Sequence, residues 1–204
     1  MRLYAVTDDA WLAGRSLAVC VRSALAGGAT FVQLRDKDAS TDELTVQAKA
    51  LIPLCAKANV PFVINDDVEA ALAVGADGVH VGQDDVTCSR ARALLGPDRI
   101  VGVSVQTLDE ALEAQAAGAD YLGVGAMFGT PTKPEAVDVS FEELASICEA
   151  VDIPVVAIGG INEKTIPSVA GLGADGVAVV SGIFAAKDIE CATRRLRDLV
   201  DEML

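Results

Sequence analysis

The feature that most constrains the fold of this chain is the alternation of short apolar, β-branched runs with longer segments of helical periodicity. The runs predict strands near 3–7, 30–34, 61–65, 77–81, 100–104, 120–124, 154–158 and 176–180. Strands that alternate with helices form parallel sheets, and eight such units close a (β/α)8 barrel. An open, doubly wound sheet would need a glycine-rich phosphate loop after its first strand, but that strand ends here in VTDD. We therefore predict an α/β fold, a compact (β/α)8 TIM barrel that forms one domain over residues 1–204.

Short motifs predict where the helices begin and end. Four expected helix-to-strand junctions repeat one pattern, reading AGGATFV, VGADGVHV, AGADYLGV and LGADGVAV. A glycine at a helix end accepts the left-handed conformation that other residues resist. Three helix starts match the capping box, at Ser40 with Glu43, Thr107 with Glu110, and Ser140 with Glu143. We expect Pro53 to kink or shorten the helix in which it falls.

Composition limits the classes of function. The 204 residues carry a formal net charge of −14, which argues against a nucleic-acid partner because such a surface needs a basic face. No apolar run approaches the roughly 18 residues of a membrane helix, and the opening MRLYAVTDD lacks the pattern of a signal peptide. We therefore expect a cytoplasmic protein with neither nucleic-acid nor membrane partners. The sequence leaves open whether it forms a homo-oligomer.

In such barrels the active site lies at the carboxyl ends of the strands. The polar residues that end the strands are therefore expected to line one pocket. The second strand ends in QLRDK, and alternation places Gln33, Arg35 and Lys37 on one side. Two cations at this spacing suit an oligophosphate better than a carboxylate. Taken alone, a solvated strand end with a local ion pair explains the motif at least as well.

Acidic residues follow the third and fourth strands, as NDD at 65–67 and QDD at 83–85. Carboxylates at adjacent tips repel each other unless a cation lies between them. One carboxylate from each tip, completed by water and phosphate oxygens, is a common way to hold Mg²⁺. The alternative is helix N-capping, and Asp67 and Asp84 are the candidates for that role. Two acidic tips on neighbouring strands favour the metal site.

The fourth and fifth strands carry one histidine and one serine of interest. His80, the only histidine, lies inside its strand rather than at the tip. We interpret it as a buried, hydrogen-bonded structural residue rather than a catalytic base. Ser104 ends the fifth strand with no second base in its motif, so a phosphate-binding hydroxyl is favoured over a nucleophile.

The last three tips suit phosphate groups. TPTK at 130–133 offers two hydroxyls and an ammonium, either as a rim for anions or as an ordinary loop. The seventh and eighth strands end in IGGI at 158–161 and VSG at 180–182. Loops after these two strands are the usual phosphate site of such barrels. They support phosphate binding and say little about the reaction.

In this order the motifs resemble those of the thiamine phosphate synthase family. The matching segments are YAVTD, QLRDK, INDD, ADGVHVGQDD, GVSV, DYLGVGAMFGTPTK, VVAIGGIN and ADGVAVVSGIF. The resemblance implies a transferase that couples a hydroxymethylpyrimidine diphosphate to a thiazole phosphate, two small phosphorylated substrates, with Mg²⁺ as cofactor. The resemblance further implies that thiamine phosphate forms and that pyrophosphate leaves in a dissociative displacement. The attacking thiazole nitrogen has no proton to lose, so no general base is expected.

The resemblance also implies roles by position. The pyrimidine diphosphate would contact Gln33, Leu34, Arg35, Asp36, Lys37, Asn65, Ser104 and Lys133. The thiazole phosphate would contact Thr130, Pro131, Thr132, Gly160, Val180 and Ser181. Asp66 and Asp85 would be the metal ligands, while Arg35, Lys37, Ser104 and Lys133 would be catalytic. Asp36 stands where the family commonly has Glu, and Gln106 where it frequently has His.

Two other functions remain alternatives. A thiazole tautomerase, an isomerase on a similar barrel, should lack the complete set of Asp66, Asp85 and Lys133. A tautomerase would also be expected to have a histidine near the fifth strand tip, where this chain has Gln106. A catalytically silent phosphate-binding barrel could keep Gly160 and Ser181, but it has no reason to keep both the cation and the carboxylate clusters.

Overall fold

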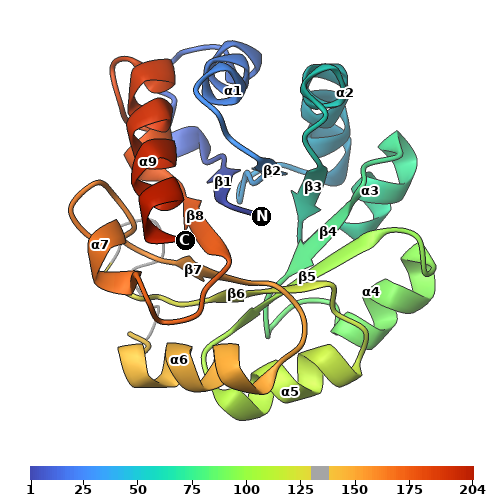
Figure 1. Cartoon of the computed structure of the whole chain (residues 1–204). Helices are drawn as coiled ribbons and strands as arrows, with labels where there is room; N and C mark the ends of the chain where they lie inside the picture. The colour runs from blue at the N-terminus through green and yellow to red at the C-terminus, as the bar shows by residue number, and fades with distance from the viewer. Residues whose placement is uncertain (130–137) are drawn as a thin grey trace.

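Eight parallel strands close into a barrel in chain order, and β8 pairs back to β1. The computed structural model describes residues 1–129 and 138–204. Figure 1 shows the strands at the centre of the molecule. They are β1 (Leu3–Val6), β2 (Phe31–Leu34), β3 (Phe62–Asn65), β4 (Gly78–Val81), β5 (Ile100–Val105), β6 (Tyr121–Val124), β7 (Val155–Ile158) and β8 (Gly176–Val179). The predicted (β/α)8 barrel is confirmed.

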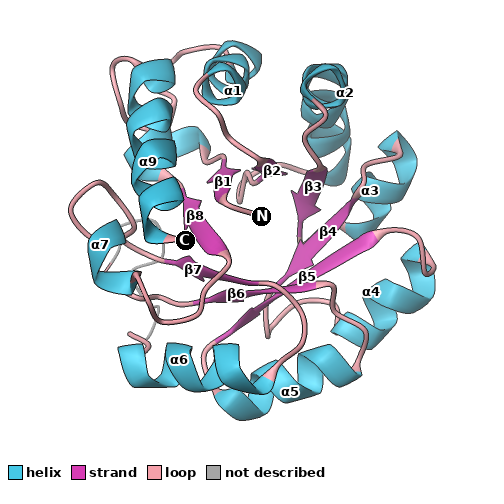
Figure 2. Cartoon of the chain, viewed as in Figure 1, coloured by secondary structure: helices cyan, strands magenta, loops and turns pink. Residues whose placement is uncertain are grey.

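Helices surround the barrel, as Figure 2 shows. A short 3-10 helix, η1 (Asp9–Trp11), follows β1. The α-helices are α1 (Leu17–Ala26), α2 (Thr41–Ala58), α3 (Val68–Val74), α4 (Cys88–Leu95), α5 (Leu108–Ala116), α6 (Phe141–Ala150), α7 (Ile166–Val169), α8 (Ser181–Phe184) and α9 (Ile189–Met203). The last helix, α9, packs beside α1. Within 1–129 and 138–204, no helix is long and apolar enough to cross a membrane.

The buried apolar residues form two separate clusters. The larger cluster lies where the outer faces of the strands meet the helices, and Leu34 and Leu51 belong to it. The smaller cluster fills the barrel interior and includes Tyr4, Phe31 and Tyr121. The three rings meet edge to face, with the Tyr4 and Phe31 centroids 4.6 Å apart. An aromatic core therefore lies beneath the carboxyl ends of the strands.

Glycines inside the barrel make room for these rings. A Cβ atom on Gly102 would lie 2.1 Å from Cζ of Tyr121, closer than any contact between carbon atoms allows. A Cβ on Gly123 would lie 3.3 Å from Cε1 of His80. The glycines of GVSV and YLGV thus serve the packing of two neighbouring side chains rather than a turn.

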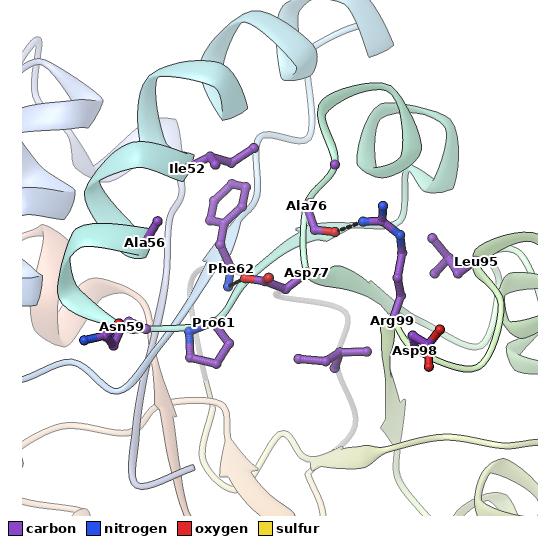
Figure 3. Close-up of a pocket in the computed structure, with 13 residues that line it drawn as sticks. Ile52, Ala56, Asn59, Pro61, Phe62, Ala76, Asp77, Leu95, Asp98 and Arg99 are labelled. Carbon is purple, nitrogen blue, oxygen red and sulfur yellow. Dashed lines mark hydrogen bonds between the residues drawn. The ribbon is translucent and has the colours of Figure 1, made fainter.

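The repeated junction pattern also has a structural reason. Its glycines, at 28, 75, 118 and 173, all take positive φ angles, as predicted. Two residues later, Asp77 donates its backbone N–H to the carbonyl of Phe62 at 2.9 Å. Its carboxylate accepts the N–H of Phe62 at 2.8 Å (Figure 3). The same reciprocal pairs join Thr30 to Leu3, Asp120 to Val101, and Asp175 to Val155. Each pair binds the start of an odd-numbered strand to the junction before the next strand.

Only one of the three expected capping boxes is complete. Ser40 and Glu43 exchange both bonds at the start of α2. Thr107 and Ser140 cap their helices, but the partner glutamates bind elsewhere. The carboxylate of Glu110 accepts the N–H of Gln106, and that of Glu143 accepts the N–H of Leu108. Glu143 therefore ties α6 to the start of α5, a contact that local spacing does not reveal.

The expectation that Pro53 shortens its helix is wrong. Helix α2 continues through Pro53 and ends only at Ala58, before Asn59 in the left-handed conformation. Leu51 and Cys55 on either side are both buried against the barrel. Packing of this apolar face compensates for the backbone hydrogen bond that proline cannot make.

Candidate active site at the carboxyl ends of the strands

The tips of the first two strands are joined by an ion pair between Arg35 and Asp8. Both side chains are largely shielded, with exposed fractions of 11% and 15%. The backbone N–H of Arg35 donates to the hydroxyl of Thr7 at 2.9 Å, which fixes the base of the side chain. Asp8 also accepts the N–H of Ala10 at the start of η1. Asp8 was not among the predicted site residues, although the VTDD tip beside a cationic strand end is a signal for it.

The other residues of QLRDK take different positions. Gln33 is buried in the barrel, and its amide N–H donates to the hydroxyl of Tyr4. Leu34 points the other way into the outer cluster, so its side chain does not face the interior with Gln33. Asp36 accepts from the amide of Gln47 at 2.7 Å and thereby ties this tip to α2. Lys37 is exposed.

Asp66 and Asp85 approach each other, as the two acidic tips predict. Burial of Asp66, hydrogen bonding with Asp85 and repulsion by that carboxylate together raise the pKa of Asp66 to about 7. The nearby charge of Arg35 and the hydrogen bond from Asn65 act in the opposite direction. The carboxylate of Asp85 accepts the N–H of Gly82 at 2.9 Å. Two carboxylates and one guanidinium thus lie within electrostatic range of one another.

The backbone at Asp66 is also unusual. Its φ angle is +62°, in the left-handed region that a non-glycine residue seldom adopts. Its N–H donates to the carbonyl of His80 at 2.7 Å, across the β3–β4 pair. Such conformations cost about 1–3 kcal/mol and persist only where the surroundings enforce them. The fold therefore holds this carboxylate in a defined place.

The donor set fits Mg²⁺ better than a transition metal. Across the described parts of the chain, no group of three or more His, Cys, Asp or Glu side chains could hold a metal ion. Mg²⁺ commonly takes one or two carboxylates and completes its shell with water and phosphate oxygens. A pair of carboxylates whose mutual repulsion a divalent cation would relieve matches that requirement.

The two remaining acidic residues of these tips differ in role. Asp67 caps α3 by accepting the N–H of Ala70 at 2.7 Å, which confirms the capping alternative for this residue. For Asp84 the same expectation is wrong, because Thr87 is the residue that caps α4. Helix α4 begins later than the QDD motif suggests, so Asp84 lies before the cap.

His80 is buried inside the barrel, as predicted, with both ring nitrogens in hydrogen bonds. Nδ1 lies 2.8 Å from the hydroxyl of Tyr121, and Nε2 lies 2.9 Å from the hydroxyl of Ser104. Burial lowers the pKa of the imidazole to about 4, so the ring is neutral near pH 7. The expectation that no histidine lies near the fifth strand tip is wrong, since His80 reaches Ser104 from the adjacent strand.

The tips of β7 and β8 lie beside the segment that follows β6. Gly160 has a φ angle of +65°, and a Cβ there would lie 2.7 Å from Cβ of Phe128. The N–H of Phe128 donates to the carbonyl of Gly159 at 3.1 Å. Val180 follows β8 as the N-cap residue of α8, and Ser181 is the first residue of that helix. Of the predicted site residues, Thr130, Pro131, Thr132 and Lys133 lie outside the described ranges.

A groove of about 810 Å³ lies at the opposite end of the barrel (Figure 3). Its walls come from α2, the end of α4, and the residues that precede β3, β4 and β5. Arg99 donates to the carbonyl of Ala76 there, and Asp77 binds Phe62. These groups bind backbone atoms of the barrel, and catalysis in such folds occurs at the other end. The groove is not the candidate active site.

The fold, with polar side chains gathered at its strand tips, is that of a (β/α)8 barrel enzyme, and comparisons with known proteins identify its family. The family model described as thiamine monophosphate synthase matches residues 3–183. A thiamine-phosphate synthase from Chloroflexus aurantiacus is 50% identical over 200 residues, which cover 98% of this chain and 92% of that protein. One from Clostridium acetobutylicum is 47% identical over 199 residues, covering 98% and 94%.

A solved structure gives the same result. Thiamine phosphate pyrophosphorylase from Pyrococcus furiosus superposes with a TM-score of 0.90 and is 43% identical. The match covers 100% of this chain and 96% of that one. The chain therefore belongs to the thiamine monophosphate synthase family, and the resemblance seen in its motifs is confirmed.

Proposed function

We propose that this chain is a transferase that makes thiamine phosphate. It couples a hydroxymethylpyrimidine diphosphate to a thiazole phosphate and releases pyrophosphate. The two partners are small phosphorylated molecules, and the proposed location is the cytoplasm. The observation that carries the proposal is the adjacency of Asp66, Asp85 and Arg35. A diphosphate held with a divalent cation needs carboxylates for the metal and a cation for the phosphates, and this site offers both.

Asp66 and Asp85 are the proposed ligands of Mg²⁺. When bound there, the ion would neutralise charge that develops on the departing diphosphate. The left-handed backbone at Asp66 and the hydrogen bond between Asp85 and Gly82 set the two carboxylates before any ligand arrives. Such preorganisation lowers the cost of assembling the site.

The cationic side chains stabilise the same leaving group. Arg35 is oriented by Asp8, so its guanidinium is in place for the diphosphate. Lys37 and Lys133 add positive charge, and the hydroxyl of Ser104 donates a hydrogen bond to a phosphate oxygen. The remaining proposed contacts to the pyrimidine substrate are Gln33, Leu34, Asp36 and Asn65. Positioning and charge stabilisation supply the rate, and the nucleophilic nitrogen needs no base.

The thiazole phosphate is assigned to the other half of the barrel mouth. Its proposed contacts are Thr130, Pro131, Thr132, Gly160, Val180 and Ser181. The phosphate sites of such barrels commonly follow strands seven and eight. Gly160 takes a positive φ angle and lies against Phe128, a conformation and a close approach that favour glycine at this tip. The nitrogen of the thiazole then faces the carbon that carries the diphosphate.

The alternatives fit the structure less well. A tautomerase has no use for the pair of Asp66 and Asp85, whose mutual repulsion a metal ion would offset. His80 does not support a tautomerase activity, because the residue is only 6% exposed and its two ring nitrogens are hydrogen-bonded to Tyr121 and Ser104. A silent phosphate-binding barrel would not need the shielded ion pair that orients Arg35.

The experiment that tests the proposal is a reaction with both substrates, with and without Mg²⁺. We expect thiamine phosphate and pyrophosphate in equal amounts, and little product after removal of the metal with a chelator. Absence of product at saturating substrate would contradict the proposal. Interconversion of thiazole phosphate tautomers without the pyrimidine substrate would instead favour the isomerase.

A further inference from the structure

Five polar side chains form a continuous hydrogen-bonded chain through the barrel interior. It runs from Gln33 to Tyr4 at 2.5 Å, from Tyr4 to Tyr121 at 2.8 Å, and on to Nδ1 of His80 at 2.8 Å. Nε2 of His80 completes it at Ser104, 2.9 Å away. Apart from Ser104, these side chains are at most 6% exposed. These hydrogen bonds join two residues on strands that are not neighbours, β2 and β5, and the proposed function places both residues against the same substrate.

Hydrogen-bond chemistry gives this chain a direction. Gln33 donates an amide N–H to the hydroxyl oxygen of Tyr4. Among the described residues, the other partner of that hydroxyl is Tyr121, so the proton of Tyr4 goes to the Tyr121 oxygen. The proton of Tyr121 then goes to Nδ1 of His80. A neutral imidazole holds one proton, which must lie on Nε2 and point at Ser104.

The direction of these hydrogen bonds matters at Ser104, the half-buried end of the hydrogen-bonded chain. A hydroxyl that receives a hydrogen bond from Nε2 keeps its own proton for another acceptor. Phosphate oxygens are acceptors, and charge-assisted hydrogen bonds to them are among the stronger ones. The opposite direction would commit the Ser104 proton to His80 and present only lone pairs to the substrate.

We propose that His80 and Tyr121 are positioning residues. Tyr121 holds the imidazole of His80 as the Nε2–H tautomer, and His80 donates to Ser104, so that Ser104 offers its own proton to the diphosphate. The inference rests on the proposed function, because that function makes the diphosphate the ligand of Ser104. Neither residue touches substrate. Both act through the hydroxyl of Ser104.

The packing around the chain agrees with a fixed geometry. The rings of His80 and Tyr121 lie with their centroids 5.4 Å apart. Gly102 and Gly123 leave space that these rings fill, and a methyl group at Gly102 would overlap Tyr121. Buried polar networks are favourable only when every member is satisfied, so one reversed link would disturb the others. Closely fitted rings and complete pairing together favour a single tautomer.

Nuclear magnetic resonance of the imidazole tests the proposal directly. His80 is the only histidine in the chain, so histidine labelled with ¹⁵N reports on this ring alone. In the intact, metal-free protein at neutral pH, we expect a protonated Nε2 and an unprotonated Nδ1. A protonated Nδ1, or an average of both tautomers, would overturn the proposal. This result does not depend on catalysis, so it stays distinct from a failure of the proposed function.

Two matched variants test the role of the proton donor. Tyr121→Phe removes the proton that Nδ1 receives, so we expect mixed tautomers and a kcat lowered about fivefold to tenfold. Its KM for the thiazole phosphate should stay unchanged. Tyr4→Phe makes the same change one link further away, and the Tyr121 proton can still reach Nδ1. It should keep the Nε2–H tautomer and lose less turnover than Tyr121→Phe. Equal losses with an unchanged tautomer in both variants would show a packing role and overturn the proposal.

Discussion

Asp8 at the end of β1 holds the guanidinium of Arg35 at the end of β2 in an ion pair, and solvent reaches little of either side chain. The pair lies between adjacent strand tips, on the side of the barrel where Asp66 and Asp85 meet. A cation aimed at a substrate is more useful when it does not need to be ordered on binding. We therefore regard Asp8 as part of the candidate site.

Substitution Asp8→Asn tests this role. It removes the charge but keeps an oxygen that can accept the N–H of Ala10. We expect turnover to fall about tenfold, because Arg35 loses its orientation and one buried charge loses its partner. Steady-state kinetics measure the change. Asp9→Asn alters an exposed neighbour in the same motif and should have little effect, and equal losses in the two variants would contradict the role of Asp8.

Removal of charge at Asp66 separates stability from activity. Asn tolerates left-handed backbone, so Asp66→Asn should keep the φ angle of +62°. It relieves repulsion from Asp85, and we expect the metal-free variant to melt at the same temperature as the parent or higher. Addition of Mg²⁺ should raise the melting temperature of the parent only. Turnover should fall roughly 100-fold or more, since a proposed metal ligand is lost.

A control for the metal prediction lies in the neighbouring motif. Asp84→Asn changes a carboxylate next to Asp85, and it should leave both the Mg²⁺ response and turnover near those of the parent. Asp85→Ala should abolish turnover while binding of the thiazole phosphate alone changes little. If Asp85→Ala weakens thiazole phosphate binding to the same degree, its assignment to the metal is wrong.

Protonation of His80 should destabilise the fold at acidic pH. Its pKa is about 4 in the folded protein against an ordinary value of 6.5, because burial disfavours the charged ring. The unfolded chain therefore takes up this proton at higher pH than the folded one. This pKa difference contributes about 3 kcal/mol to the free energy of unfolding. The contribution is fully present above pH 6.5 and is lost as the pH falls towards 4.

The titration of the single imidazole resonance measures this directly. Its midpoint should lie near pH 4, and a midpoint at 6 or above would contradict the burial argument. The total free energy of unfolding is a less specific measure, since Asp66 acts in the opposite direction. Its raised pKa contributes stability at low pH that disappears as the pH rises through 7.

The arrangement of the barrel could be predicted because buried parallel strands produce continuous apolar runs. The strand expected at 61–65 is Phe62–Asn65, and the one expected at 176–180 is Gly176–Val179. The polar tips were predicted for the same reason, since side chains at strand ends are released from the burial requirement. Alternation further placed Gln33 and Arg35 on one side of β2, opposite the buried Leu34.

The contacts between distant strands could not be predicted in the same way. Tyr4 and Tyr121 are 117 residues apart in sequence, yet their hydroxyls lie 2.8 Å apart. Strand alternation tells which face a residue occupies, but the stagger of eight strands decides which residues share a level. His80 was correctly assigned to the interior, and its contact with Ser104 required the register of β4 against β5.

The repeated junctions lead to a last prediction, which concerns stability alone. Asp175 accepts the N–H of Val155 at 2.8 Å and donates its own N–H to the same residue at 2.7 Å. Asp175→Ala leaves the N–H of a buried residue without an acceptor, and we expect the free energy of unfolding to fall by about 1–3 kcal/mol. Asp175→Asn keeps an oxygen in place and should lose less than half of that amount. Chemical denaturation measures both values, and equal losses would mean that the charge, rather than the hydrogen bond, stabilises the start of β7.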